Sequence, residues 1–291
     1  MDVSIIIVNY NTSILISKLM KTIEEKTEGI SYEVIVVDNN PTERFAIDLK
    51  DYLDKIIYLP LKENLGFGRA NNEGLKVAKG RNIFFLNPDT LLKNNALKIL
   101  SDYLDLNEDV GVCGGNLFNA ENEPTHSYQM VFPSLIWELN LLLGKCMLYR
   151  TLFGKSFTFN YTDKVKEVAY ITGADMMVKR SVLEEVGSFN SLFFMYYEET
   201  ELSFRIHKAG YKICSIPQAE IFHLEGKSVE NNLRKQKMML ASRKIYYKLT
   251  DGKKVLDDLI CITTFYVRYL LCVLRKDSDG AQYWKTIKDL V

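Results

Sequence analysis

Short apolar runs alternate with segments of helical periodicity along the first half of the chain. The runs at residues 3–9, 33–38 and 81–86 are rich in Val and Ile and apolar nearly throughout, as are strands buried on both faces of a parallel sheet. Between them, residues 14–26 and 70–79 carry apolar side chains at intervals of three or four, which predicts amphipathic helices. This order predicts an open, doubly wound α/β sheet.

Weaker signals continue this pattern and then interrupt it. Residues 56–60 and 110–118 are expected to form strands, and residues 94–106 a helix. No period persists over residues 119–163, which indicates an insertion. Within it, the strongly apolar residues 135–153 predict one or two short helices.

Regular patterns return in the second half of the chain. Residues 168–179 have strand character, and the last strands are expected at 211–215 and 220–223. Residues 181–186 and 198–209 predict helices because each is followed by a glycine that can end it. The remaining chain is expected to be helical, with breaks near 250–252 and 277–280.

Composition indicates an ordinary globular protein with an uneven charge distribution. The 291 residues are 47% hydrophobic with six prolines, which excludes a disordered or collagen-like chain. The 37 basic and 37 acidic residues balance, but 14 of the basic and only 7 of the acidic residues lie from Gly226 onward. The body is therefore acidic, and it lacks the basic reading element that a nucleic-acid partner would need.

Compartment signals favour the cytoplasm. Five cysteines, without CxxC spacing or a Cys/His cluster, favour reduced thiols over zinc or a disulfide framework. The first residues lead directly into a strand and lack the features of a secretory signal. The longest apolar stretch, 259–274, contains Arg268 and is shorter than the roughly 20 residues of a membrane span, so no transmembrane helix is expected.

Polar side chains follow three of the predicted strands directly, at residues 9–11, 38–40 and 87–89. In an open parallel sheet, ligands bind at the carboxyl ends of the strands. Tyr10 offers a flat face for a base, Asp38 an acceptor for a ring N–H, and Asp89 an oxygen ligand for a divalent cation. The alternative is that these residues only turn the chain or cap the next helix.

These strand ends belong to longer motifs that lie in order along residues 1–225. The motifs lie at residues 3–11, 36–40, 63–74, 85–90, 172–177, 189–190, 194–202 and 221–223. Together they resemble family 2 glycosyltransferases, in particular the rhamnosyltransferase-like branch. The resemblance implies the glycosyltransferase A fold, with a nucleotide-binding half at 1–118, an acceptor half at 119–225 and a C-terminal helical extension at 226–291.

The resemblance assigns roles to the nucleotide side of the site. It implies that Tyr10 stacks on a pyrimidine, that Asp38 pairs with the base, and that Asp89 binds the Mg²⁺ or Mn²⁺ that neutralises the diphosphate. Asn87 stands where many relatives have a second aspartate, so metal dependence is less secure than in those relatives. His223 occupies a position where some relatives supply an imidazole to the metal or phosphate, unless it only caps the strand.

A glycine-rich stretch, residues 66–68, opens the helix after the third strand. Its glycines allow close approach of the backbone to a ligand, and the N–H groups of a helix start favour negative charge. We expect Gly66, Arg69, Asn9 and Asn87 to contribute to nucleotide binding. The alternative for Arg69 is a solvated position on the helix surface.

The acidic cluster at residues 198–201 is the most informative part of the sequence. Transfer of a sugar to a hydroxyl needs a base, and the resemblance places Glu199 in that role. Glu stands at 199 and 201, where the family usually has Asp, and helix capping is the structural alternative. Neighbouring carboxylates are expected to raise one another's pKa. The residues expected around the donor sugar or acceptor are Gly173, Ala174, Glu198 and Glu201.

These features predict an inverting glycosyltransferase. It would move a sugar from dTDP-rhamnose or a UDP-sugar to a hydroxyl of a glycan or lipid-linked glycan in surface polysaccharide synthesis. The alternative is a nonenzymatic nucleotide-sugar-binding or assembly subunit, because Glu replaces Asp at positions 199 and 201. A dehydrogenase is disfavoured because no phosphate-binding glycine turn follows the first strand.

The C-terminal region carries a separate signal. Residues 227–254 are basic with interleaved Leu, Met and Tyr, and residues 259–274 are apolar and aromatic. This combination predicts peripheral contact with an anionic membrane at its cytoplasmic face, through residues such as Tyr266 and Leu270. The alternatives are that these helices pack on the body or form a homodimer.

Overall fold

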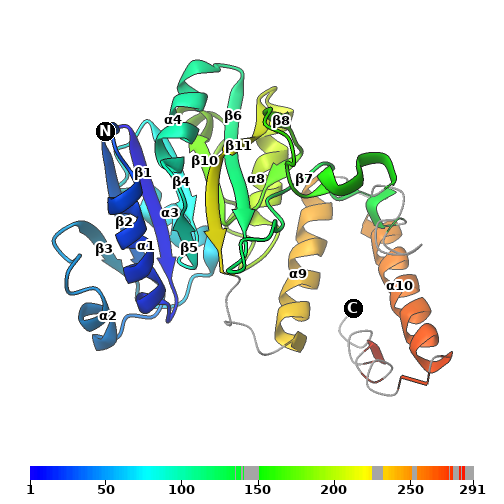
Figure 1. Ribbon diagram of the computed structural model, residues 1–291. Coiled ribbons are helices and arrows are strands. Elements are labelled where there is room, and N and C mark those ends of the chain that lie inside the picture. Colours follow the sequence, from blue (N-terminus) through cyan, green and yellow to red (C-terminus); the bar gives the residue numbers. More distant parts are fainter. Residues whose placement is uncertain are drawn as a thin grey trace.

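A computed structural model describes residues 1–134, 136–138, 140, 151–224, 232–250, 254–274, 276–277, 282 and 284–285. The described residues form a mixed sheet of nine strands with helices on both faces (Figure 1). One half of the sheet is parallel, in the order β3-β2-β1-β4, and its strands are β1 (Val3–Asn9), β2 (Tyr32–Asp38), β3 (Ile56–Pro60) and β4 (Asn82–Leu86). All four strands were predicted from the apolar runs.

The other half of the sheet mixes directions. Its strands are β10 (Asp175–Lys179), β6 (Val110–Phe118), β11 (Lys212–His223), β5 (Thr90–Leu92) and β8 (Lys166–Glu167). Strand β10 runs antiparallel to both β4 and β6, β11 runs parallel to β6, and β5 and β8 pair with β11 in antiparallel fashion. A separate small sheet pairs β7 (Tyr128–Gln129) with β9 (Tyr170–Ile171).

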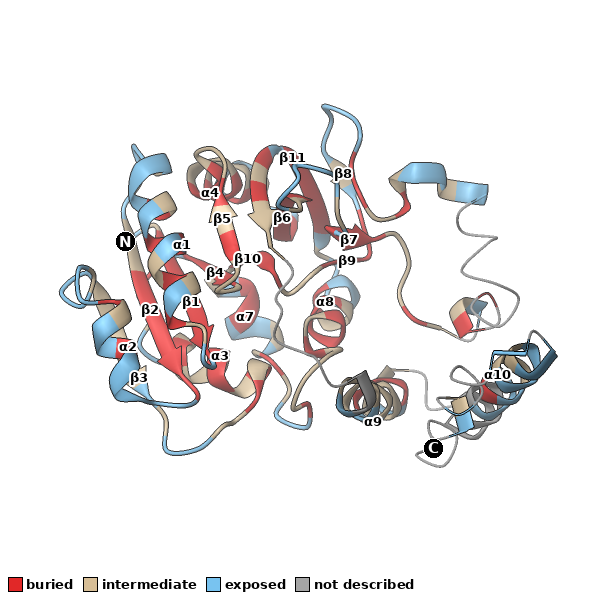
Figure 2. Ribbon diagram, turned by 60° about the horizontal axis from the view of Figure 1, so that its bottom comes forward, coloured by how far each residue is buried: buried red, intermediate tan, exposed pale blue. Residues whose placement is uncertain are grey.

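The helices divide between the two faces of the sheet. Their bounds are α1 (Ser13–Lys26), α2 (Glu43–Asp48), α3 (Phe67–Leu75), α4 (Ala96–Leu106), α7 (Arg180–Val186), α8 (Glu198–Lys208), α9 (Asn232–Thr250) and α10 (Lys254–Leu274), with a 3₁₀ turn at η1 (Gly154–Phe157). Helices α1 and α4 pack with Val3, Ile5 and Ile7 of β1, whereas α3, α7 and α8 pack with Ile6 and Val8. Because strand side chains alternate, β1 serves two cores and is buried along its whole length (Figure 2).

Two expectations about the second half differ from the structure. The single strand expected at 168–179 is interrupted by a turn at residues 172–174, which separates β9 from β10. Conversely, the strands expected at 211–215 and 220–223 are one strand, β11, whose pairing with β6 shifts register between Ser215 and Glu220. Pro217 lies in this irregular stretch and has no N–H to donate to the ladder.

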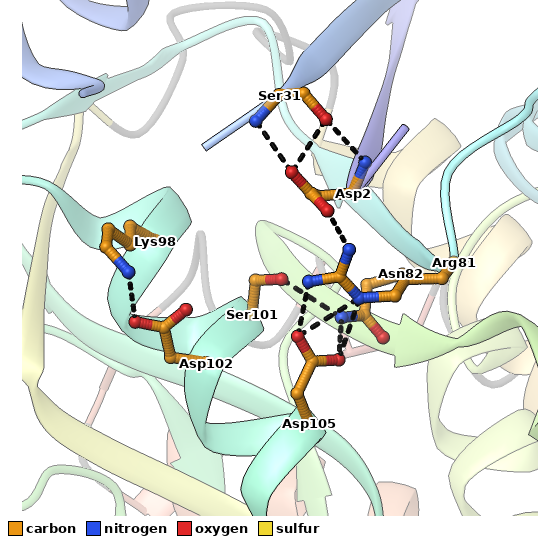
Figure 3. Close-up of polar contacts among 8 residues, drawn as sticks. All are labelled: Asp2, Ser31, Arg81, Asn82, Lys98, Ser101, Asp102 and Asp105. Atoms are coloured by element: carbon orange, nitrogen blue, oxygen red, sulfur yellow. Dashed lines mark hydrogen bonds and ion pairs between the residues drawn. The ribbon is translucent and has the colours of Figure 1, made fainter. Parts of the chain in front are cut away.

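A polar cluster joins elements at the amino ends of the parallel strands (Figure 3). Arg81 forms ion pairs with Asp2 and Asp105, and Asp105 also accepts a hydrogen bond from Asn82 Nδ2 at 3.0 Å. Asp2 accepts hydrogen bonds from the backbone N–H and hydroxyl of Ser31. The cluster links the starts of β1, β2 and β4 to the end of α4. It lies at the amino ends of the parallel strands, away from their carboxyl ends.

Helix α9 packs against α8 and the segment before it. Tyr246 and Tyr247 are buried with Phe193, and Ser242 Oγ donates a 2.7 Å hydrogen bond to the carbonyl of Met195. Tyr247 also donates a hydrogen bond to Glu138 at 2.7 Å. The basic part of the C-terminal region therefore packs on the body, as one of the alternatives predicted.

Several expectations fall outside the described residues. These are the domain boundary at residue 226, most of the helices expected within 135–153, and the break at 277–280 beyond Asp277. Across the helices that are described, none combines the length and apolar character needed to cross a bilayer.

Candidate active site

A cavity of about 670 Å³ opens at the carboxyl ends of the parallel strands. The loops after β1, β2 and β4 line the cavity together with the turn at 172–174 and residues 194–196 and 198–199. His223, at the end of β11, and two side chains of α9 complete the lining. Most of the site residues predicted from sequence therefore meet in one place, which is where an open sheet binds its ligand.

The nucleotide side begins with the loop after β1. Tyr10 lines the cavity and is 47% exposed, so its ring face is available to a ligand. Asn9 is buried beneath it and is bonded to both neighbouring segments: Nδ2 donates to Asp38 Oδ1 at 2.8 Å, and Oδ1 accepts from the backbone N–H of Thr12 at 2.9 Å. Asn9 thereby holds the loop that presents Tyr10.

Asp38 lies just below the cavity. Its side chain is fully buried, and its oxygens accept hydrogen bonds from Asn9, from the backbone N–H of Asn40 and from the hydroxyl of Tyr58. Burial and the bond to Asp38 raise the pKa of Tyr58 to about 12, which keeps this hydroxyl a donor. In the structure Asp38 fixes the ends of β1, β2 and β3 relative to one another, and its contact with a base remains a prediction.

The next residue, Asn39, lines the cavity itself. Its Nδ2 donates to the carbonyl of Gly66 at 3.0 Å, and its Oδ1 accepts from the backbone N–H of Leu65 at 3.2 Å. Gly66 has φ +83°, and a Cβ at this position would overlap the carbonyl oxygen of Phe194. That same oxygen accepts a hydrogen bond from the N–H of Phe67 at 3.0 Å, so the start of α3 is fastened to the segment that leads to Glu199.

Asp89 and His223 face each other across the cavity floor. The distance from Asp89 Oδ1 to His223 Nε2 is 3.5 Å, and the backbone N–H of Leu224 donates to the Asp89 carbonyl at 2.9 Å. Asn87 lines the cavity beside them, and its carbonyl accepts hydrogen bonds from Thr90. Strand β5 creates this contact, because it pairs Thr90 with His223.

The acidic cluster begins α8. Glu198 and Glu199 both line the cavity. Burial, with the nearby charge of Glu199, raises the pKa of Glu198 to about 8, and its Oε2 has no hydrogen-bond partner in the described part of the protein. Burial likewise raises the pKa of Glu199, which accepts a hydrogen bond from the Thr200 hydroxyl at 3.3 Å. A carboxylate with a raised pKa suits a base that works near neutral pH.

The backbone that leads into α8 is strained. Tyr196 and Tyr197 have φ values of 71° and 68°, in the left-handed region that non-glycine residues seldom adopt. Tyr196 lines the cavity, and Tyr197 packs against Tyr246 of α9. Such conformations cost on the order of 1 kcal/mol each and persist where the surrounding packing imposes them, often at functional sites.

Four predicted site residues lie outside the cavity lining: Asn9 and Asp38, described above, and Glu201 and Arg69. Glu201 is buried and forms a two-point contact with Arg205, at 2.8 and 3.0 Å. Arg205 also donates to the carbonyls of residues 186–188, so this pair ties α8 to the end of α7. Arg69 donates through Nε to the carbonyl of Leu65 at 2.7 Å. Gly173 and Ala174, by contrast, line the cavity as expected.

Several lining residues were not singled out from the sequence. Asn39 and Tyr196 lie inside motifs that the sequence analysis identified, but neighbouring residues in those motifs were assigned the functional roles. Arg234 and Met238 reach the cavity only because α9 packs beside α8, and no local pattern marks them.

A mixed, mainly parallel sheet with a cavity at its strand ends, lined also by the carboxylates that begin α8, is the architecture of glycosyltransferases with the GT-A fold. Residues 4–187 match the family model described as glycosyl transferase family 2. The chain belongs to this family, which confirms the predicted fold class and enzyme class.

Individual proteins are similar over most of the chain. Rhamnosyltransferase WbbL of Escherichia coli K12 is 28% identical over 237 residues, covering 76% of this chain and 83% of WbbL. The N-acetylglucosaminyl-diphospho-decaprenol L-rhamnosyltransferase of Mycobacterium tuberculosis is 22% identical over 231 residues, covering 75% of each chain. The solved mannosyltransferase PcManGT from Pyrobaculum calidifontis, in complex with GDP-Man and Mn²⁺, shares the fold with a TM-score of 0.59 at 15% identity, covering 98% of this chain and 78% of that one.

Proposed function

We propose that this glycosyltransferase moves a sugar, with inversion, from a nucleoside diphosphate donor to a hydroxyl of a glycan acceptor. The observation that carries the proposal is the shared cavity, because Tyr10, Asp89 and Glu199 all line it. The acceptor oxygen attacks the anomeric carbon as the bond from that carbon to the diphosphate oxygen breaks. Glu199 takes the proton of the acceptor hydroxyl.

The residues at the cavity floor fit a divalent cation. Asp89 offers a carboxylate and His223 an imidazole, 3.5 Å apart. In the part of the chain that the structure describes, no three His, Cys, Asp or Glu side chains cluster to hold a metal by themselves. Mg²⁺ typically needs one or two protein ligands together with substrate phosphates and water, so two ligands suffice. When bound, such a cation would neutralise charge on the leaving diphosphate.

The donor is proposed from the named relatives and the base site. Two relatives are named as rhamnosyltransferases, which favours dTDP-rhamnose, with UDP-sugars as the second choice. A thermal-shift panel of nucleotide sugars with Mg²⁺ or Mn²⁺ tests this choice. Stabilisation by purine nucleotides alone would contradict the assigned base site.

Replacement of Glu199 tests the chemistry. Glu199→Gln keeps the shape of the side chain but removes the base, so we expect transfer to fall by a factor of about 10² to 10⁴. Binding of the nucleoside diphosphate should change little. Glu184→Gln, an exposed position on α7, is the matched control and should retain full activity. Unchanged turnover in Glu199→Gln would remove this residue from the mechanism, and absence of turnover in the wild type with every donor would favour the nonenzymatic alternative.

We further propose that the enzyme works at the cytoplasmic face of a membrane, because one relative is named for a lipid-linked diphosphate acceptor. Helix α10 supports this, since Tyr266, Leu270 and Leu274 are 50%, 56% and 70% exposed and recur every four residues on one side of the helix. A stripe of this kind suits insertion into a lipid surface.

Flotation with anionic vesicles tests the membrane proposal. The double variant Tyr266→Ser and Leu270→Ser should lose flotation, whereas Leu106→Ser, an exposed leucine at the end of α4, should keep it. Absence of flotation at low and high salt would contradict the proposal. A concentration-dependent dimer that the double variant disrupts would instead assign the stripe to a homodimer.

A further inference from the structure

Acidic side chains outnumber basic ones in the described lining of the cavity. The lining includes three acidic residues, Asp89, Glu198 and Glu199. Arg234 is the only Arg or Lys in the described lining. A nucleoside diphosphate adds further negative charge, so electrostatic balance makes this single arginine significant.

Arg234 is exposed near the start of α9, and no hydrogen bond or ion pair joins its side chain to another described residue. Met238, one helical turn later, lines the same cavity, so this face of α9 is turned toward the site. The guanidinium is thus available to a ligand.

The packing of α9 fixes where Arg234 lies. Ser242 Oγ donates a hydrogen bond to the carbonyl of Met195, and Tyr246 packs against Tyr197, so α9 contacts the strained segment before Glu199. Lys235, which follows Arg234, lies over the ring of Tyr196 with Nζ 6.0 Å from its centroid. Arg234 therefore lies on a helix that packs against the segment leading to the proposed base.

We propose that Arg234 binds the diphosphate of a substrate through its guanidinium. This proposal rests on the proposed function, which brings a diphosphate into the cavity. A guanidinium offers paired N–H donors that match two phosphate oxygens, and it stays charged at every working pH. The diphosphate belongs either to the nucleotide donor or to a lipid-linked acceptor.

Binding of dTDP and UDP to the full-length protein tests the proposal, with thymidine and uridine as phosphate-free probes. Arg234→Gln should weaken binding of the preferred nucleoside diphosphate about tenfold, as expected for loss of a charge-assisted contact, and leave nucleoside binding unchanged. Arg234→Lys should restore part of the loss. Lys237→Gln, an exposed position on the same helix that does not line the cavity, removes the same charge and should have no effect.

Kinetics separate the two sources of the diphosphate. If Arg234 binds the donor, Arg234→Gln raises the donor KM; if it binds the acceptor, nucleotide binding is unchanged and only the acceptor KM rises. If the wild type binds and turns over donor, and Arg234→Gln shows the same binding and kinetics as Lys237→Gln, this proposal alone would be overturned. A wild type that neither binds nor turns over any nucleoside diphosphate sugar would overturn the proposed function with it.

Discussion

Gly66 makes a sharp test of how the two sides of the cavity are joined. Its φ of +83° and ψ of −174° form a backbone conformation that is essentially restricted to glycine and costs an alanine on the order of 1 kcal/mol. The added Cβ would also overlap the Phe194 carbonyl, which accepts the 3.0 Å hydrogen bond from the N–H of Phe67. Losing that bond adds about 1 kcal/mol. We therefore expect Gly66→Ala to lower the free energy of unfolding by about 2–3 kcal/mol.

Gly210 provides the matched control for this experiment. It also has a positive φ, +95°, but an added Cβ there would meet no atom within 4 Å. Gly210→Ala should thus show only the backbone cost of about 1 kcal/mol. Urea unfolding followed by circular dichroism measures both variants. If Gly66→Ala proves no less stable than Gly210→Ala, Phe194 does not press on Gly66 and the proposed junction is incorrect.

Two further variants test the assigned charges by the pH dependence of stability. Burial raises the folded-state pKa of Glu198 from 4.5 to about 8, so the stability associated with its protonated form is complete below pH 4.5 and is lost as the pH rises toward 8; Glu198→Gln should flatten this decline in urea unfolding. Burial of Asp105 raises the pKa of its carboxyl, but hydrogen bonds from Arg81 and Asn82 outweigh burial and lower this pKa below its usual value. The stability that ionised Asp105 contributes is therefore present near neutral pH and is lost as the pH falls through the folded-state pKa. Asp105→Asn should cost about 1 kcal/mol at pH 7 and little at pH 2, and an equal cost at both would refute the charge-based explanation.

The parallel half of the sheet was predictable because the residues of each strand show its burial by their own apolar pattern. Residues 3–9 are apolar at successive positions, and only a strand buried on both faces uses such a run. The direction of β10 was not predictable, since the same residues would pair equally well in either direction on their local pattern. Its antiparallel course depends on the long connection from β6, which the sequence shows only as an insertion.

The site residues also divide into those that the sequence predicts and those that only the structure reveals. Tyr10, Asp89 and Glu199 follow or begin predicted elements, and their chemistry marks them. Which of Asp38 and Asn39 faces the cavity depends on the course of the chain after β2, where chemistry alone favoured the acid. The left-handed backbone at Tyr196 and Tyr197 carries no glycine or asparagine signal, because packing from α9 imposes it.

The ion-pair cluster around Arg81 joins the amino ends of the parallel strands (Figure 3), and the cavity lies at their carboxyl ends. The charges that hold these strands together are therefore remote from the loops that line the cavity. Substitutions at Asp2, Arg81 or Asp105 should change stability independently of changes in those loops, because distant sites without shared partners act additively.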